Sequence, residues 1–142
     1  MRGDGRISIQ NAPDGEFDLL ILDAFNSDAI PAHLVSREAV AMYRTKLKPD
    51  GAILFHVSNR YLMIEKLVAA LVEDDGLLGL ERNDDDESDA GKSRSSFIIA
   101  APRWATVSDL AAGGQWFPVL RPKGFSAWTD DYSNLLGILR LR

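Results

Sequence analysis

The sequence predicts an α/β fold with a mostly parallel sheet of about four or five strands, flanking helices and a C-terminal antiparallel strand pair. Two short apolar runs, FDLLILDAF at 17–25 and AILFHVS at 52–58, lie between turn residues. Such unbroken runs are typical of strands that are covered on both faces. A segment with helical periodicity follows each run, and this alternation indicates parallel strands joined by right-handed crossovers.

The segment before the first run is ambiguous, because RISIQ at 6–10 alternates like a short strand but also suits the start of a poorly formed helix. Turn residues at 11–16 separate it from the first strand, and an irregular loop is expected at 26–34. Ser36 then caps a helix that carries Glu38 in its first turn. One face of that helix is apolar and consists of Ala39, Val40, Tyr43 and Leu47.

A second helix is expected after the second strand. The KPDG turn at 48–51 ends the first helix, and Ser58 or Asn59 begins the second. Spacing of i, i+3, i+4 and i+7 places four apolar residues on one face: Ile64, Leu67, Val68 and Leu71. Gly76 ends this helix in a left-handed cap.

The C-terminal part is less regular. Strands at 77–81 and 96–102 are predicted to form an antiparallel hairpin around the polar loop at 82–92. Three segments follow: a short helix within 106–114, an irregular stretch at 115–128, and a closing segment at 131–140 that is either helical or extended.

Composition excludes several classes of function. The 142 residues suit one domain over 1–142. No apolar run approaches the ~18 residues that cross a bilayer, and no signal-peptide core is present. We therefore expect a soluble, cytoplasmic chain without a membrane segment, although a longer parent could be membrane-attached. The absence of cysteine excludes disulfides and thiolate sites, and a net charge of −5 without a basic tract argues against a nucleic-acid partner.

Chemistry-bearing side chains follow both predicted strands. Asp23 ends the first strand, Asp28 lies in the next loop, and His56 lies near the end of the second strand. Ligands of open α/β sheets bind at the carboxyl ends of the strands, so these groups are expected at one rim. Asp23, partly buried at the border of the core, suits a general base or a partner for an amine cation. The alternatives are that the two aspartates cap loop amides and that His56 is a satisfied core residue.

Other polar features give weaker signals. The acidic run at 84–89 fails the EF-hand template, so we expect a solvated loop and no metal site. Asp130 and Asp131 either cap the terminal segment or return to the strand rim. The sequence contains no GxGxxG, GxxxxGK[ST], HExxH or GxSxG motif.

Five motifs together resemble those of spermidine synthase-like proteins: GDGR at 3–6, FDLLILDAFNSDAIPAHL at 17–34, LKPDG at 47–51, HVSNRYL at 56–62 and WTDDYSNLL at 128–136. The resemblance is greatest to a bacterial group in which such a domain is often fused to membrane-spanning segments. It implies a partial Rossmann-like fold, that of S-adenosylmethionine-dependent methyltransferases. Aminopropyltransferases of this family use decarboxylated S-adenosylmethionine and a diamine.

The same resemblance implies roles for individual residues. Asp4 matches the GDG aspartate that contacts the adenine amine. Asp23 and Asp28 match the two aspartates of a DSSD-type loop, which contact the amine substrate, and the first helps to deprotonate the attacking nitrogen. We assign His56 to the same substrate side. A polyamine cation needs carboxylate partners, and its attacking nitrogen must be neutral, so this set of residues suits the chemistry.

Two departures from the family pattern set limits on this reading. Four residues separate Asp23 from Asp28, two more than in DSSD. The sequence also begins at the GDG element, whereas the glycine-rich loop and the ribose-binding acid of the family lie upstream. Backbone amides of such a loop are a main part of a cofactor site. We therefore expect no tightly bound cofactor and no turnover by this chain alone, with decarboxylated S-adenosylmethionine or S-adenosylmethionine as the family co-substrate.

Two further functions stay open: a non-catalytic binding or assembly module of the same fold, and part of a methyltransferase with a non-polyamine substrate. The expected small-molecule partner is a polyamine or a nucleoside. We also expect a homodimer, because the apolar strand at 17–23 would form an unprotected sheet edge. The alternative is that residues 6–10 fold back as a strand and leave a monomer.

Overall fold

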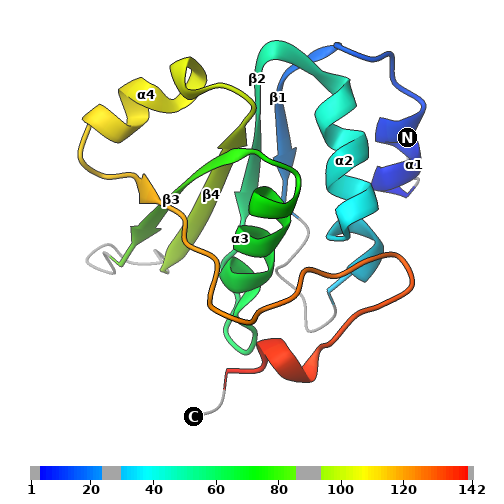
Figure 1. The fold of residues 1–142 in the computed structure, drawn as a ribbon, viewed down its shortest axis with the longest axis vertical. Coiled ribbons are helices and arrows are strands. Elements are labelled where there is room, and N and C mark those ends of the chain that lie inside the picture. Colours follow the sequence, from blue (N-terminus) through cyan, green and yellow to red (C-terminus); the bar gives the residue numbers. More distant parts are fainter. Residues whose placement is uncertain (1–3, 24–29, 86–93, 141–142) are drawn as a thin grey trace.

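A five-stranded sheet forms the centre of the computed structural model, which describes residues 4–23, 30–85 and 94–140. The strand order is β1-β2-β4-β3-β5 (Figure 1). The strands are β1 Phe17–Leu22, β2 Leu47–His56, β3 Leu78–Asp84, β4 Ser95–Ala101 and β5 Phe117–Pro118. The α-helices of the described residues are α1 Gly5–Gln10, α2 Arg37–Lys46, α3 Ile64–Asp74 and α4 Trp104–Ala112. Short 3-10 turns occur at Ala32–Leu34 and Leu136–Ile138.

The α/β class is confirmed, but the prediction of a mostly parallel sheet is wrong. Among the described strands, only the β1–β2 pair is parallel. β4 runs antiparallel to both β2 and β3, and β5 runs antiparallel to β3. The predicted antiparallel pair of β3 and β4 is present, but β4 also inserts between β3 and β2. β1, β2 and β3 therefore point in one direction, as helical crossovers require, without all being neighbours.

Helices cover the two faces of the sheet unequally. α2 and α3 pack on one face with the larger core cluster, and α4 packs on the other with a smaller cluster around Leu80 and Val107 (Figure 1). α2 begins as predicted, because the Ser36 hydroxyl accepts a hydrogen bond from the Ala39 amide at 3.1 Å. The residues predicted for the two apolar helix faces are buried: Ala39, Val40 and Tyr43 on α2, and Ile64, Leu67, Val68 and Leu71 on α3. Leu47, predicted as the last residue of the first face, is also buried, but it begins β2 and does not belong to α2.

Several element boundaries differ from the predicted ones. Residues 6–10 belong to helix α1 and not to a strand, because the Asp4 carboxylate accepts the Arg6 amide and caps a helix there. α3 begins at Ile64, five residues beyond Asn59. The Asn59 side chain instead accepts the amides of the next turn.

Two other differences lie in extended segments. The KPDG turn at 48–51 is included in β2, although α2 ends before it as expected. Residues 117–118, in a stretch expected to be irregular, form the short strand β5 against β3. The closing segment at 131–140, predicted to be helical or extended, is irregular, with isolated bridges at Tyr132 and Leu139 and one 3-10 turn at Leu136–Ile138.

The irregular C-terminal segment contributes to the core although it contains little regular structure. Trp128 is 1% exposed and Ile138 is fully buried. The Ile138 carbonyl accepts the Met63 amide at 2.7 Å, and the Arg140 amide donates to the Tyr61 carbonyl at 2.8 Å. In Figure 1 this orange-to-red segment passes across the ends of α3 and α2. The segment therefore closes the helical face of the sheet. Among the described helices, none combines the length and apolarity of a bilayer-crossing helix.

Gly51 gives a test of packing at the start of β2. A Cβ atom there would lie 2.8 Å from the Phe17 carbonyl oxygen, which belongs to the backbone of β1. We expect Gly51→Ala to lower the free energy of unfolding by about 1–3 kcal/mol, because backbone must shift to relieve the overlap. Gly5→Ala is the matched control, because a Cβ at Gly5 meets no atom within 4 Å. Urea unfolding of both variants measures the difference, and equal stabilities would contradict this prediction.

Candidate functional site

The two strand-end residues predicted to share a rim are in contact. Leu22 lies opposite Phe55 in the parallel β1–β2 register, so the next residues, Asp23 and His56, face each other. Nδ1 of His56 is 2.8 Å from Oδ1 of Asp23. The Asp23 side chain is 54% exposed and that of His56 is 20% exposed. Asp23 is thus more open to solvent than its position after an apolar run predicts, and its carboxylate is accessible to a ligand.

The His56 ring is held by an aromatic neighbour on β4. Phe97 lies opposite His56 in the antiparallel β2–β4 register. Their rings stack with centroids 4.8 Å apart and planes inclined by 20°. The ring is therefore fixed on one side by Phe97 and at Nδ1 by Asp23, which is more constraint than a surface histidine usually has. No local pattern in the sequence marks Phe97, because its role depends on strand pairing.

Other residues near the rim have mainly structural contacts. The Ser58 hydroxyl accepts the Ser96 amide at 2.7 Å and so ties the end of β2 to β4. Asn59 accepts the amides of Tyr61 and Leu62 through its side-chain oxygen. Asp28 lies outside the described residues, so its predicted place beside Asp23 stays a prediction.

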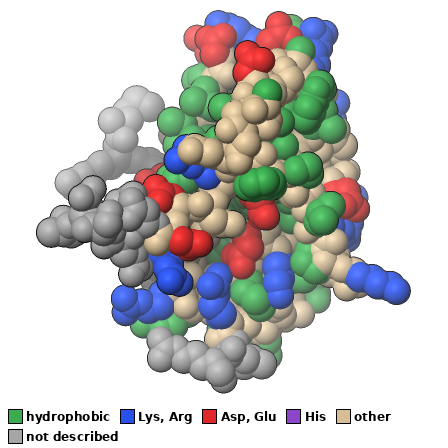
Figure 2. Space-filling view, turned by 90° about the vertical axis from the view of Figure 1, so that its left-hand side faces the viewer, with side chains coloured by type: hydrophobic (Ala, Val, Ile, Leu, Met, Phe, Trp, Pro, Cys, Tyr) green, Lys and Arg blue, Asp and Glu red, His purple; other side chains and the backbone are tan. Residues whose placement is uncertain are grey.

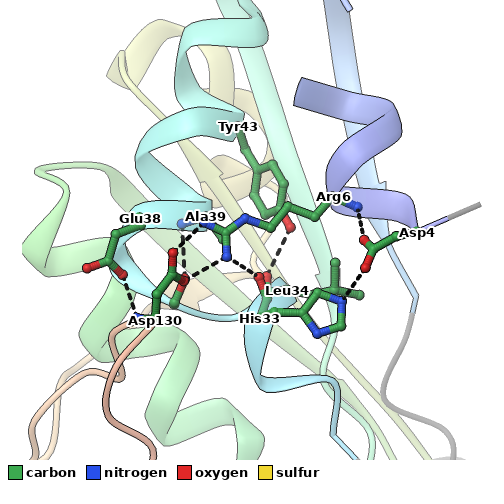
Figure 3. Close-up of polar contacts among 9 residues, drawn as sticks. Asp4, Arg6, His33, Leu34, Glu38, Ala39, Tyr43 and Asp130 are labelled. Atoms are coloured by element: carbon green, nitrogen blue, oxygen red, sulfur yellow. Dashed lines mark hydrogen bonds and ion pairs between the residues drawn. The ribbon is translucent and has the colours of Figure 1, made fainter. Parts of the chain in front are cut away.

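Asp4 belongs to a different polar cluster. One of its carboxylate oxygens caps α1 at the Arg6 amide, 2.9 Å away, and the other lies 3.1 Å from Nε2 of His33 (Figure 3). Both oxygens thus have partners within the chain. The structure therefore gives Asp4 a capping role, and its predicted contact with an adenine amine stays a prediction from the resemblance.

The same cluster joins the two ends of the chain through Arg6 and Asp130. The Arg6 guanidinium donates to both Asp130 carboxylate oxygens at 2.7 Å and to the His33 carbonyl at 2.9 Å (Figure 3). The Ser36 hydroxyl donates to Asp130 at 2.5 Å, and the Asp130 amide donates to Glu38 at 2.9 Å. Bidentate arginine–carboxylate pairs are strong and directional. We refer to Arg6, Ser36, Glu38 and Asp130 as the terminal latch.

Charge in the terminal latch is strongly stabilised. The Arg6 guanidinium, followed by the Ser36 hydroxyl, lowers the pKa of Asp130 to about 2. The same contact raises the pKa of Arg6. Close by, burial raises the pKa of Tyr43 to about 12, so its hydroxyl stays protonated and donates to the Leu34 carbonyl at 3.1 Å. Asp130 and Arg6 both lie in sequence motifs, but no local pattern predicts that they pair, because they are 124 positions apart.

A pocket elsewhere on the described surface is lined by Arg37, Glu38, Ala41, Leu71, Asp74 and Asp75. No group of three or more His, Cys, Asp or Glu side chains is arranged within the described residues to hold a metal ion. Figure 2 shows one face, on which the Lys and Arg side chains of the described residues are interspersed with Asp and Glu.

Solved structures of other proteins have a similar arrangement of strands and helices. No family model and no curated protein matches the sequence. A probable spermidine synthase from Corynebacterium glutamicum is structurally similar, with a TM-score of 0.62 and 16% identity over 94% of this chain and 54% of that chain. Spermidine synthase from Thermotoga maritima gives a TM-score of 0.58 and 16% identity over 99% of this chain and 45% of that chain.

This chain has a spermidine synthase-like fold. At 16% identity the similarity extends to the fold alone, and the chain spans about half the length of either neighbour. The resemblance noted in the sequence is thus supported at the level of architecture.

Replacement of Asp130 tests the terminal latch. Because folding lowers the pKa of Asp130 to about 2 from an ordinary 3.8, its ionised form stabilises the fold above about pH 4. This contribution is lost as the pH falls from 4 toward 2. We expect Asp130→Asn to lower stability at pH 7, and the difference from the unmodified chain to shrink over that acid range. Thermal unfolding at several pH values measures it, with the exposed neighbour change Asp131→Asn as the control. A pH-independent difference would contradict the assignment.

Proposed function

We propose that this chain is a spermidine synthase-like domain related to aminopropyl transfer, in which Asp23 and His56 bind an amine. The observation on which this rests is the 2.8 Å contact between His56 Nδ1 and Asp23 Oδ1 at the carboxyl ends of β1 and β2. That position is where open α/β sheets bind their ligands. The spermidine synthase-like fold supports an amine as the ligand, since a cationic substrate requires an accessible carboxylate.

In this geometry the two residues have different roles: Asp23 orients the imidazole ring, and His56 accepts a proton. With Asp23 ionised, the proton of a neutral His56 is on Nδ1 and donates to the carboxylate. The lone pair is then on Nε2, which makes that nitrogen the proton acceptor. Asp23 orients the ring and offers charge to the ammonium group, and Phe97 fixes the ring plane. In this proposal the base is the Asp23–His56 pair, not the Asp23 carboxylate alone.

Aminopropyl transfer requires a site to align two reactants and to accept one proton. The neutral amine nitrogen attacks the carbon next to the sulfonium of decarboxylated S-adenosylmethionine. The new N–C bond forms as the C–S bond breaks, and sulfur leaves as the neutral thioether of methylthioadenosine. The proton released from nitrogen passes to His56. Beyond removing this proton, the protein mainly has to align the two reactants.

Few of these residues are suited to binding the nucleoside part of the co-substrate. The sequence has no GxGxxG loop, and both Asp4 carboxylate oxygens have partners in the chain. We therefore propose that the chain binds an amine better than a nucleoside and does not catalyse transfer by itself. Amine binding without turnover is compatible with a non-catalytic module as well as with part of an enzyme.

Amine binding is tested by titrating the chain with 1,4-diaminobutane and following histidine ring signals by NMR. The chain has two histidines, so His33 serves as an internal reference. We expect the His56 signals to move, and Asp23→Asn to weaken binding roughly three- to tenfold by removing a charged hydrogen-bond partner. Asp50→Asn removes another exposed carboxylate, paired with Arg103, and is expected to leave binding unchanged. Equal weakening by both variants would show that binding depends on the net charge of the chain and not on Asp23, and would contradict the proposal.

Nucleoside binding is tested by calorimetry with S-adenosylmethionine, its decarboxylated form and methylthioadenosine. We expect no binding at micromolar concentration, because no glycine-rich loop is present to bind the cofactor. An assay for aminopropyl transfer with the same chain is expected to show no product. Micromolar affinity for any of the three ligands would show that a nucleoside site exists and that its location has been misjudged.

A further inference from the structure

The row of side chains that begins with Asp23 and His56 continues across the sheet to an arginine. Phe97 lies opposite His56 in the β2–β4 register, and Arg82 lies opposite Phe97 in the β3–β4 register. Directly opposed residues of neighbouring strands point to the same face of a sheet. The row therefore crosses four strands near the carboxyl ends of β1, β2 and β3, with a carboxylate at one end and a guanidinium at the other.

This row lies on the face of the sheet that α4 partly covers. Two positions further from the rim, Leu80 and Ile99 face each other and belong to the apolar cluster around Val107 of α4. α4 follows the end of β4 at Ala101, whereas Phe97 lies near the beginning of that strand, so helix and row are at opposite ends of β4 (Figure 1). The row is thus part of the rim and not of the core beneath α4.

Arg82 carries a charge that no group in the described residues neutralises. Its side chain is half-buried, and within the part of the chain that the structure describes it has no hydrogen-bond or ion-pair partner. Arg103, by comparison, pairs with Asp50 at 3.2 Å. A guanidinium stays protonated in proteins, and its partial removal from water is unfavourable without a counter-charge. Arg82 is therefore suited to receive an anionic group from a ligand.

We propose that Arg82 binds a carboxylate at the far end of the ligand whose amine is bound by Asp23 and His56. This inference rests on the proposed function and names the class of its substrate, an aliphatic amine that also carries a carboxylate. The planar guanidinium matches a carboxylate through two parallel hydrogen bonds. Two strand spacings separate β2 from β3, so the Cα atoms of His56 and Arg82 are about 10 Å apart. Because the arginine side chain is long, an aliphatic chain shorter than this distance joins the two charges.

The centre of the row suits the aliphatic part of such a ligand. Between the polar pair and Arg82 lies the Phe97 ring, which stacks on His56 at a centroid distance of 4.8 Å. In the adjacent row on the same face, Leu54 and Ile99 face each other and are half-buried. Contact with methylene groups would remove this partly exposed apolar surface from water. The order of carboxylate, apolar centre and guanidinium is thus complementary to an ammonium, an aliphatic chain and a carboxylate.

Two ligands with the same number of carbons test the role of Arg82 in the 142-residue chain. The first, 6-aminohexanoate, has an amine and a carboxylate, and the second, hexylamine, has the amine alone. NMR of the His56 ring signals follows the binding of both. We expect 6-aminohexanoate to bind about tenfold more tightly than hexylamine, because a charge-assisted bidentate contact is added.

Arg82→Gln is expected to abolish this tenfold difference and not to weaken the binding of hexylamine. Arg82→Lys, which keeps the charge but loses the planar pair of donors, is expected to retain an intermediate difference. Arg103→Gln is the matched control, because it removes an arginine that is already paired with Asp50, and it is expected to leave both affinities unchanged. Circular dichroism of each variant checks that it is folded.

The outcomes separate this inference from the proposed function. Equal affinities of the unmodified chain for the two ligands would overturn the carboxylate site and leave the amine site in place. Equal losses of affinity for 6-aminohexanoate in Arg82→Gln and Arg103→Gln would also overturn it, since the effect would then follow the net charge of the chain. If neither ligand moves the His56 signals, the amine site itself is wrong, and the assignment of Arg82 is overturned with it.

Discussion

The parallel pairing of β1 with β2 is the constraint on which the candidate site depends. Its register sets Leu22 opposite Phe55 and therefore brings Asp23 to His56 one step later. A shift of one residue would turn every side chain of β1 to the other face, exposing Leu20 and Leu22 and separating the polar pair. Burial of the apolar residues thus fixes the geometry of the polar ones. The site is a consequence of packing in the strands that precede it.

The terminal latch is the second long-range constraint. Arg6 and Asp130 join α1 to the C-terminal segment, and Ser36 and Glu38 connect both to the start of α2. Ser36 serves two purposes, since its hydroxyl caps α2 and also donates to Asp130. These polar contacts hold in place a segment that has little regular structure but delivers Trp128 to the core. The terminal latch therefore holds the C-terminal segment in a fixed position, as strand pairing holds the strands of the sheet.

The fold and the function of this chain are supported to different degrees. A probable spermidine synthase and a spermidine synthase are similar to it in fold over about half of their length. One fold can serve many activities, so function has to be argued from the site. Here the argument is local: an accessible carboxylate, an oriented imidazole and a stacked aromatic ring occur together.

Much of the local structure could be predicted from the sequence, because its signals lie within a few residues. The apolar run before Asp23, the Ser36 cap and the buried faces of α2 and α3 are of this kind, and so is the rim shared by Asp23 and His56. The position of β4 between β2 and β3 depends on the tertiary structure, since hairpin signals in the sequence do not say which of the two paired strands lies next to β2. The Arg6–Asp130 pair and the stacking of Phe97 on His56 likewise depend on contacts between distant residues. Sequence periodicity determines which side chains are buried, whereas strand order and polar pairing are selected by the packing of the whole chain.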